Sequence, residues 1–305
     1  MRILFLFLDG VGLGEDDPAI NPLVEGLPSV RALLEGRALT QANAPFHGAR
    51  ASLLALDATL GVPGLPQSAT GQAALLTGRN IPREIGEHYG PKPNPQVAAH
   101  LQDGGIFGTL KRAGRRIALL NAYPAAYFEA IARKRRIYSA IPLAVTQAGL
   151  PLFTEDDLLA GNALSADFTG EGWRTQLNRP HIRLLPPEQA GRSLARLATD
   201  YDFAFFEYWL SDYAGHAADA EAARALLVTL NAVFTGLLEE WDGGSGLLLL
   251  TSDHGNLEDM RTRRHTANPV PALVIGDPAL RAEFCRDLGA ISDVAPAIVR
   301  FFSTP

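Results

Sequence analysis

The sequence predicts an α/β protein built on a mostly parallel, doubly wound sheet with helices on both faces and a small inserted lid. Apolar segments of strand length recur along the chain, and each is bounded by Gly, Pro or Asp. These segments are almost continuously hydrophobic, which is typical of strands covered on both faces. Helical patterns lie between them, and this alternation favours a parallel sheet. The predicted strands are residues 3–8, 117–120, 203–208, 247–250 and 272–275.

The first strand, residues 3–8, ends directly at Asp9 and a glycine-rich turn. Its apolar run is too short for the hydrophobic region of a signal peptide. No other apolar run approaches the length of a membrane span. We therefore expect a soluble, cytoplasmic protein that has no membrane partner. The sequence gives no indication of the oligomeric state.

The glycine-rich turn, residues 10–14, superficially resembles a dinucleotide-binding loop. Its glycines have the spacing G-x-G-x-G, and no clear helical pattern follows in residues 15–18. Asp9 would also place a negative charge beside the pyrophosphate of a dinucleotide. The sequence therefore disfavours a nucleotide cofactor.

Residues 79–187 are richer in Pro, Gly, Asn and aromatic residues than the rest of the chain. Residues 117–123 should still belong to the main sheet, whereas residues 124–187 are predicted to form a lid that includes a helix capped by Thr154. The core would then comprise residues 1–123 and 188–305. Helical patterns in the second part cover residues 188–199 and 218–241, and Ser292 is the expected N-cap of a last helix with Pro296 in its first turn.

Size and charge narrow the functional class. The 305 residues suffice for one large α/β domain with an insertion, or for two domains. The net charge of -6 argues against a nucleic acid or an anionic membrane as the main partner. Short basic clusters at residues 133–136 and 261–264 remain candidate anion contacts. The single cysteine, Cys285, excludes an internal disulfide.

Acidic and histidine side chains cluster after the predicted strands. Parallel sheets bind ligands beyond the carboxyl ends of their strands, so these side chains should meet at one edge. Carboxylates and imidazoles are common ligands of divalent metal ions. Three carboxylates and three imidazoles are what a site for two metal ions needs. The residues are Asp9, Asp212, His216, Asp253, His254 and His265.

The spacing of these residues leaves their individual roles open. Asp212 and His216 can face one ion from a helical turn, although a capping Asp and a surface His would have the same spacing. Asp253 and His254 are adjacent, so they can serve two neighbouring ions or share one. His265 gains significance only because the other ligands need a sixth partner.

Ser68 is the candidate nucleophile. A helical pattern follows it, so Ser68 should lie near a helix N-terminus, where free N–H groups and the helix dipole favour a phosphate. A serine hydroxyl is a poor nucleophile at neutral pH unless its pKa is lowered, and coordination to a divalent metal lowers it. The alternative is that Ser68 or Thr70 only caps the helix.

Together these motifs resemble the alkaline phosphatase superfamily, and most closely its branch with phosphopentomutase and the metalloenzyme domain of cofactor-independent phosphoglycerate mutase. The resemblance covers the strand before Asp9, the turn at Ser68 and nearly everything from residue 203 onward. Three segments are highly specific in combination: Ser-Asp-His-Gly-Asn at 252–256, His-Thr-Ala-Asn-Pro-Val-Pro at 265–271 and Ser-Asp-Val-Ala-Pro at 292–296.

The resemblance implies two divalent metal ions and a phosphorylated serine. In this family the phosphorylated residue lies three positions before the glycine of the turn, and Gly71 makes this residue Ser68 rather than Thr70. The ligand types suit Mn²⁺ or Zn²⁺, and an Asp-rich site could accept Mg²⁺. The implied ligands are Asp9, Ser68, Asp253 and His254 for one ion, and Asp212, His216 and His265 for the other.

We expect a phosphoryl-transfer enzyme that acts on a small phosphorylated metabolite. Both mutase families have a His directly after the glycine of the turn, where this chain has Gln72, and the chain has no room for the large inserted domain of phosphoglycerate mutase. With a small lid, water should reach the phosphoserine, which favours a phosphomonoesterase over a phosphomutase. The alternatives are a phosphodiesterase or a non-catalytic, metal-stabilised binding protein. A sulfatase is disfavoured because no C/S-x-P-x-R motif surrounds Ser68.

The substrate itself cannot be identified from the sequence, because specificity should come from the lid. Polar side chains near its predicted boundary are candidates for substrate contacts. These are Arg79, Asn80, Asn121 and Tyr123, together with Arg83 and residues 133–136.

Overall fold

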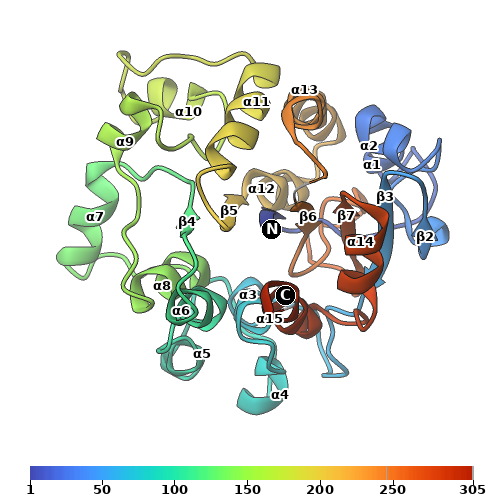
Figure 1. The fold of residues 1–305 in the computed structure, drawn as a ribbon, viewed down its shortest axis with the longest axis horizontal. Helices are drawn as coiled ribbons and strands as arrows, with labels where there is room; N and C mark the ends of the chain where they lie inside the picture. Colours follow the sequence, from blue (N-terminus) through green and yellow to red (C-terminus); the bar gives the residue numbers. More distant parts are fainter. Residues whose placement is uncertain (245, 304–305) are drawn as a thin grey trace.

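The computed structural model describes residues 1–244 and 246–303. In this part of the chain, seven strands form one sheet in the order β2-β3-β7-β6-β1-β5-β4 (Figure 1). All of the predicted strands are present, and β2 and β3 add to them at one edge. The strands are β1 (Arg2–Leu8), β2 (Phe46–His47), β3 (Ala51–Leu56), β4 (Ile117–Leu119), β5 (Phe203–Tyr208), β6 (Gly246–Thr251) and β7 (Val270–Ile275).

The predicted α/β fold with a mostly parallel sheet is confirmed. Strands β6, β1, β5 and β4 are parallel neighbours, and Ile3 of β1 pairs with both Phe203 and Leu247. Strand β7 is antiparallel to β6 and to β3, so β3 points in the same direction as the parallel strands, and only β2 and β7 run the other way. The sequence does not predict β3, because residues 51–56 contain no β-branched or aromatic side chain.

Helices cover both faces of the sheet. One face packs against α3, α5, α6, α8, α14 and α15, and the other against α1, α2, α11 and α13. The helices are α1 (Leu23–Gly26), α2 (Pro28–Leu33), α3 (Ser68–Thr77), α4 (Ile81–Ile85), α5 (Pro95–His100), α6 (Gly105–Arg112), α7 (Ala125–Ala132), α8 (Ala140–Gln147), α9 (Glu155–Ala160), α10 (Glu171–Thr175), α11 (Pro187–Ala198), α12 (Leu210–Ala217), α13 (Ala220–Glu240), α14 (Pro278–Cys285) and α15 (Val294–Ser303), with 3₁₀ turns η1 (Gln41–Asn43) and η2 (Ile291–Asp293).

The central strand β1 shows why its sequence is continuously apolar. Ile3, Phe5 and Phe7 pack into the hydrophobic cluster on one face, whereas the alternating leucines of β1 pack into the cluster on the other. The ring of Phe5 lies 4.5 Å from that of Phe205 on β5. Because successive side chains point to opposite faces, a strand buried on both sides needs apolar residues at every position.

Two predicted helix caps have different outcomes. Thr154 caps α9 as expected, in a capping box with Asp157. Ser292 is not the N-cap of the last helix, because it lies inside η2 and α15 begins two residues later, at Val294. The Asp293 carboxylate accepts hydrogen bonds from the Gly289 and Ala290 N–H groups, and these bonds stabilise the 3₁₀ turn that replaces the simple cap.

The segment predicted as a lid, residues 124–187, carries α7 to α10 beside the end of β4 (Figure 1). Its helix α8 is built into the core, since Ile141 and Val145 are fully buried and α8 contacts α3 and α6. Trp173 of α10 packs in a small separate cluster with Ala122 and Ile182. The division of the chain into a core and a lid stays a prediction.

Helix α13 is, within the described residues, the one helix long and apolar enough to cross a membrane by length and composition alone. Its buried apolar residues, such as Leu227 and Phe234, face the sheet, whereas Val228 is exposed, and the helix packs closely along α11. A Cβ atom on Gly191 would lie 2.0 Å from the Val233 carbonyl oxygen, and one on Gly236 would lie 1.9 Å from that of Glu188. These glycines therefore let the two backbones approach. A cytoplasmic location stays a prediction.

We expect Gly191→Ala to destabilise the protein, because the added methyl group would collide with the backbone of α13. Overpacking of this kind costs about 1–3 kcal/mol, measurable as the free energy of unfolding in urea. The control is Arg192→Ala, which removes only a surface ion pair with Glu239 at 2.6 Å. That loss should be below about 1 kcal/mol. Equal losses in both variants would contradict a close contact between the helices.

Candidate metal centre

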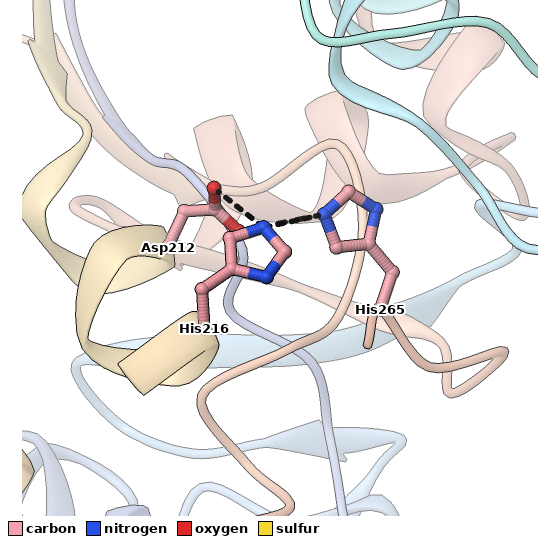
Figure 2. A group of neighbouring side chains, drawn as sticks. All are labelled: Asp212, His216 and His265. Carbon is pink, nitrogen blue, oxygen red and sulfur yellow. Dashed lines mark hydrogen bonds and ion pairs between the residues drawn. The ribbon is translucent and has the colours of Figure 1, made fainter. Parts of the chain in front are cut away.

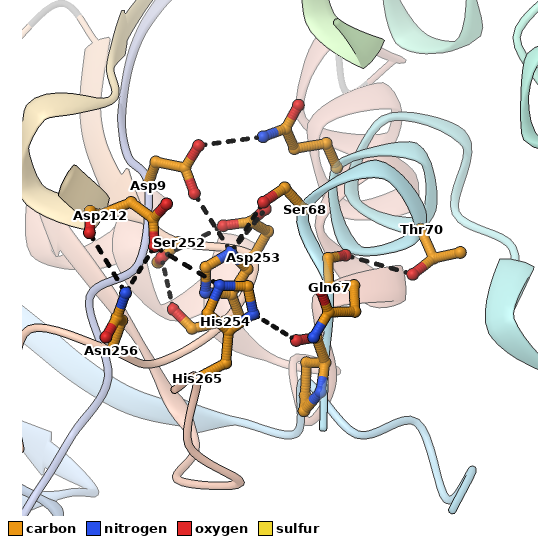
Figure 3. Close-up of polar contacts among 12 residues, drawn as sticks. Asp9, Gln67, Ser68, Thr70, Asp212, Ser252, Asp253, His254, Asn256 and His265 are labelled. Carbon is orange, nitrogen blue, oxygen red and sulfur yellow. Dashed lines mark hydrogen bonds and ion pairs between the residues drawn. The ribbon is translucent and has the colours of Figure 1, made fainter. Parts of the chain in front are cut away.

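The structure brings the predicted metal ligands together at the carboxyl ends of β1, β5 and β6 (Figure 2 and Figure 3). Asp9 directly follows β1, Asp253 and His254 follow β6, and α12, which carries Asp212, follows β5. This is the edge at which a parallel sheet binds ligands. His265 reaches the same place from the loop that precedes β7.

The first cluster surrounds the imidazole of His254. Its Nε2 atom lies 3.0 Å from Ser68 Oγ, 3.3 Å from Asp9 Oδ1 and 3.7 Å from Asp253 Oδ2 (Figure 3). His254 and Asp253 are completely buried, and Asp9 and Ser68 are nearly so. The four residues predicted to share one ion therefore have their polar atoms within a few ångströms of one nitrogen.

The second cluster consists of Asp212, His216 and His265 (Figure 2). His216 Nε2 lies 3.3 Å from Asp212 Oδ2 and 3.2 Å from His265 Nε2, and Asp212 Oδ1 lies 3.6 Å from His265 Nε2. Asp212 and His216 are one helical turn apart on α12, as their spacing predicts. The rings of His254 and His265 stack with their centroids 3.7 Å apart, so the two clusters adjoin.

Backbone carbonyl groups fix the orientation of both histidines in the second cluster. The Nδ1 atom of His265 lies 2.7 Å from the Pro66 carbonyl oxygen, and Nδ1 of His216 lies 2.7 Å from that of Arg263. A carbonyl oxygen only accepts, so each Nδ1 must carry the hydrogen. In the neutral rings the Nε2 lone pairs are then free and face the centre of the cluster, which is the arrangement of metal-binding histidines.

Buried carboxylate oxygens fit this donor set to divalent cations. Asp9 Oδ1 and Asp253 Oδ2 are buried and accept no hydrogen bond, and both lie near His254 Nε2, at 3.3 and 3.7 Å. Burial raises the pKa of Asp253 well above its usual value, and the charge of Asp9 raises it further. Carboxylates crowded together in the interior are costly unless positive charge compensates them. The residues present therefore suit a metal site, whose oxygen and nitrogen donors match the predicted ions.

The two stacked histidines differ in charge state. Burial by itself lowers the pKa of His254, but the carboxylates of Asp253 and Asp9 outweigh this effect and raise it to about 10. Burial and the neighbouring His254 lower the pKa of His265 to about 4. In the metal-free protein at neutral pH, His265 is therefore uncharged, which is the form that binds a metal ion, whereas His254 carries a proton that it must release to bind one.

Ser68 is the first residue of α3, and its hydroxyl group faces His254. Helix α3 has no side-chain N-cap hydrogen bond, so Ser68 is not serving as a simple cap. The hydroxyl group of Thr70 donates to backbone carbonyl oxygens, those of Gln67 at 3.2 Å and Tyr89 at 3.3 Å. Of the two hydroxyl groups in this turn, only that of Ser68 therefore points into the first cluster.

Gln72 lies one turn after Ser68 on α3 and is also part of the centre. Its side chain is buried, and its Nε2 atom donates to Asp9 Oδ2 at 3.3 Å. An amide at this position can donate to a carboxylate but brings no charge. Gln72 therefore helps to orient Asp9 without adding a further ionisable ligand.

Glu258 is a structural residue of the centre that the sequence does not reveal. Its buried carboxylate accepts hydrogen bonds from the N–H groups of Gly12 at 2.9 Å and Asn256 at 2.7 Å, and from the side chains of Thr266 and Asn268. A Cβ atom on Gly12 would lie 2.3 Å from Glu258 Oε1. The glycine-rich turn therefore allows close approach of this carboxylate, which explains the glycines without a dinucleotide.

Asn256 supports Asp212 in a similar way, and no local sequence pattern predicts this role. Asn256 Nδ2 donates to Asp212 Oδ1 at 2.8 Å. Gly10 adopts φ +69°, and a Cβ atom there would lie 2.7 Å from the same carboxylate oxygen. The turn after β1 thus needs glycine both for its conformation and for its contact with Asp212.

The residues predicted to contact substrate lie apart from Ser68 or already have structural partners. Arg79 and Asn80 follow the far end of α3, about 15 Å along a helix of this length from Ser68. Arg79 pairs with Glu84, and Asn80 caps α4. Asn121 is buried and bonds the backbone of Glu207 with both atoms of its side-chain amide.

Tyr123, the remaining predicted contact, is buried beneath the centre. Its hydroxyl group donates to Glu207 Oε2 at 3.4 Å. Glu207 is a buried residue of β5 that pairs in register with Phe7 of β1, two residues before Asp9. Burial, with a smaller effect of the Asp9 charge, raises the pKa of Glu207 to about 8. A protonated carboxyl group therefore lies below the ligands at neutral pH.

A cleft of about 580 Å³ opens beside the second cluster. His216 and His265 line it, together with Gln67, the neighbour of Ser68, and with Arg263 and Arg264. Among the described residues these two arginines form no ion pair. Nearby Arg261, in contrast, is held by Asp259 at 2.8 Å and Glu15 at 2.9 Å. The cleft therefore presents positive charge beside the metal ligands, which favours anionic ligands.

Comparison with known proteins shows sequence similarity to one family and to two mutases. Residues 188–305 match the model of the Metalloenzyme superfamily. A 2,3-bisphosphoglycerate-independent phosphoglycerate mutase from Serratia proteamaculans is 33% identical over 147 residues, which are 43% of this chain and 28% of the mutase. The corresponding mutase of Coxiella burnetii is 31% identical over 107 residues, 33% of this chain and 20% of the mutase. The chain thus matches between a fifth and a third of the length of these relatives.

Solved structures share the fold of the whole chain. A protein from Pyrococcus horikoshii has a TM-score of 0.56 at 15% identity, with 99% of this chain and 96% of that chain covered. Alkaline phosphatase from the Antarctic bacterium TAB5 has a TM-score of 0.53 at 14% identity, with 99% and 98% covered. The predicted resemblance is confirmed: residues 188–305 match the Metalloenzyme superfamily model, and the whole chain shares the fold of alkaline phosphatase.

The raised pKa of Glu207 makes the stability of the metal-free protein depend on pH. The folded protein keeps a proton on this carboxyl group until about pH 8, whereas the unfolded chain releases it near pH 4.5. Its stabilising contribution is therefore complete below pH 4.5 and is lost as the pH rises to about 8. We expect urea unfolding to show Glu207→Gln gaining stability relative to wild type over this range. A constant difference would contradict the raised pKa.

Proposed function

We propose that this protein is a two-metal phosphoryl-transfer enzyme that forms a phosphoserine at Ser68 from a small phosphorylated metabolite, and that it acts as a phosphomonoesterase. The observation that carries the proposal is the position of the Ser68 hydroxyl group, at the N-terminus of α3 and 3.0 Å from His254 within the first cluster. The names of the relatives, phosphoglycerate mutase and alkaline phosphatase, support phosphoryl transfer as the reaction class.

Two divalent ions, Mn²⁺ or Zn²⁺ with Mg²⁺ as the third candidate, would occupy the two clusters. Asp9, Ser68, Asp253 and His254 would hold one ion, and Asp212, His216 and His265 the other. Asp212 also lies within 4.8 Å of Asp9 and His254, so its carboxylate stands between the two sites. When bound, the ions supply the positive charge that lowers the pKa of the serine hydroxyl group and stabilises the phosphoryl oxygens.

The proposed reaction has two steps, transfer of the phosphoryl group to Ser68 and its release to water. A bond forms between Ser68 Oγ and phosphorus as the bond from phosphorus to the leaving oxygen breaks, and the proton of the serine hydroxyl group ends on the leaving oxygen. Water then attacks phosphorus as the bond between phosphorus and Ser68 Oγ breaks; a proton of the water returns to Ser68 Oγ, and inorganic phosphate is released. The positive end of the α3 dipole and its first N–H groups favour the phosphoryl group at this position. Gln72 keeps Asp9 oriented by its hydrogen bond at 3.3 Å.

The open cleft supports hydrolysis over mutase action. Arg263 and Arg264 at its rim are exposed, so solvent reaches the second cluster from this side. A mutase must keep its substrate between the half-reactions, because water would otherwise consume the phosphoserine. The mutases named above are also matched over only 20% and 28% of their lengths. We therefore do not assign the mutase activity of these relatives to this chain.

Metal analysis tests the two-ion arrangement. We expect two divalent ions per chain after loading with Mn²⁺ or Zn²⁺, and one ion in His216→Ala, because that substitution removes a ligand of the second cluster alone. The control is His181→Ala, whose imidazole pairs with Glu155 outside the centre. This variant should retain both ions. A second ion that persists in His216→Ala would show that the ligand assignment is wrong.

Substitution of the two hydroxyl residues of the turn tests the nucleophile. Ser68→Ala should lower kcat/KM for phosphate monoesters by at least about a thousandfold, because the covalent route is lost. Thr70→Ala is the matched control and should retain most of the activity. Intact-protein mass spectrometry should detect a phosphate-sized increase in wild type and none in Ser68→Ala.

Two other outcomes would replace the proposal. Faster cleavage of bis-aryl than of mono-aryl phosphates would indicate a phosphodiesterase on the same scaffold. Two bound ions without turnover of any phosphate ester would indicate a metal-stabilised binding protein. Full turnover by Ser68→Ala would rule out the phosphoserine while leaving the metal centre intact.

A further inference from the structure

A second pocket, of about 530 Å³, lies between residues 122–177 and helix α12. Its volume is within the range of sites that bind small molecules. Its walls differ from those of the cleft beside the second cluster, because aromatic side chains from both sides of the pocket line it. These are Tyr123, Tyr127, Trp173, Trp209 and Tyr213. We refer to it below as the aromatic pocket.

Helix α12 places the aromatic pocket beside the metal centre. Asp212 and His216 lie on one face of α12 (Figure 2), whereas Trp209 and Tyr213 line the pocket. At 100° per residue, positions 209 and 213 fall directly next to positions 212 and 216 around the helix. The two sites therefore occupy neighbouring faces of a single helix.

The floor of the pocket leads to the same centre. Tyr123 lines the pocket, and its hydroxyl group reaches Glu207 at 3.4 Å. Glu207 pairs with Phe7 on the strand that ends at Asp9. A ligand in the pocket would therefore lie beside both clusters. Tyr123 and Glu207 connect the pocket to the strand that ends at Asp9, and α12 carries residues of the pocket and of the second cluster on adjacent faces.

Tyr127 lines the pocket and has a hydroxyl group without a hydrogen-bond partner. Its side chain is only 8% exposed, and its hydroxyl oxygen is buried without a hydrogen-bond partner. The ring packs against Tyr123 with centroids 4.7 Å apart, which holds it in place. A buried hydroxyl group without a partner is destabilising, so its retention is explained if a ligand completes the bond.

Three charged side chains line the pocket, the basic Arg136 and the acidic Asp167 and Glu171. The Arg136 guanidinium lies over the Tyr127 ring at 4.7 Å, and Arg136 makes no ion pair with any residue that the structure describes. Asp167, by contrast, is engaged by the N–H groups of Gly170 and Gly172 and by Ser165. Glu171 also lines the pocket and is exposed to solvent.

We propose that the aromatic pocket binds the organic part of the phosphorylated substrate and that this part carries a planar aromatic ring, as in a nucleoside or aryl phosphate. This inference rests on the proposed phosphoryl transfer at Ser68. Flat rings stack favourably on tyrosine and tryptophan, and a heteroatom of the ligand would pair with the free hydroxyl group of Tyr127. The phosphoryl group would then extend toward α12 and the metal centre.

Relative rates with three substrates test the proposal. The metal-loaded enzyme should have a kcat/KM for adenosine 5′-monophosphate and phenyl phosphate at least about tenfold above that for glycerol 1-phosphate, since stacking on one aromatic group is worth this much. Tyr127→Phe should raise the KM for adenosine 5′-monophosphate severalfold while its thermal stability is unchanged or increased. The matched control, Tyr138→Phe, alters a tyrosine that contacts Tyr127 but does not line the pocket. Its kinetics should equal those of wild type.

Tryptophan fluorescence gives a second readout that does not need turnover. Two of the three tryptophans, Trp173 and Trp209, line the aromatic pocket, and Trp241 lies elsewhere. In the Ser68→Ala background, adenosine should quench the fluorescence of the protein in a saturable way, and glycerol should not. Trp209→Phe should weaken this quenching, whereas Trp241→Phe should leave it unchanged.

The two readouts separate failure of this inference from failure of the proposed function. Equal kcat/KM values for the aromatic and non-aromatic esters, without quenching by adenosine, would overturn the aromatic pocket as a substrate site while phosphoryl transfer stands. Saturable quenching without turnover of any ester would overturn the proposed function, and with it the role of the bound ligand as a substrate.

Discussion

The structure depends on holding three carboxylates close together in the interior. Asp9, Asp212 and Asp253 meet where the strands of the parallel sheet end, and burial removes the water that would otherwise screen them. Two of their oxygen atoms have no hydrogen-bond partner. Repulsion of this kind is tolerated when cations neutralise it, so the stability of the fold and its chemistry are expected to depend on the same ions.

The loops around the centre are held by one carboxylate that belongs to neither cluster. Glu258 bonds the turn after β1, the segment after β6 and the loop before β7. These three segments are distant in sequence and carry Asp9, His254 and His265, respectively. Because one carboxylate accepts hydrogen bonds from all three segments, it fixes their positions relative to one another. The glycines at positions 12 and 255 leave the space that this carboxylate occupies.

The sequence predicts the central part of the fold well, because buried parallel strands leave an unmistakable apolar pattern. It also predicts which Asp and His residues meet, since the ends of such strands share one edge. It fails at β3, whose Leu and Ala residues do not indicate a strand, and at Ser292, where a 3₁₀ turn replaces the cap. Long-range contacts such as those of Glu258 have no local signature. Asn121, one of the polar residues predicted to contact substrate, uses its side-chain amide to bond the backbone of Glu207, and the substrate contacts stay a prediction.

The hydrogen bond between His265 and the Pro66 carbonyl group joins the second cluster to the turn that carries Ser68. A side chain that is held in place at the second cluster therefore also restrains Ser68. Under the proposed function the linkage is reciprocal: a phosphoryl group that orders this turn must also tighten the binding of the second ion by the same free energy. The second ion would then be bound more tightly when substrate is present than when it is absent.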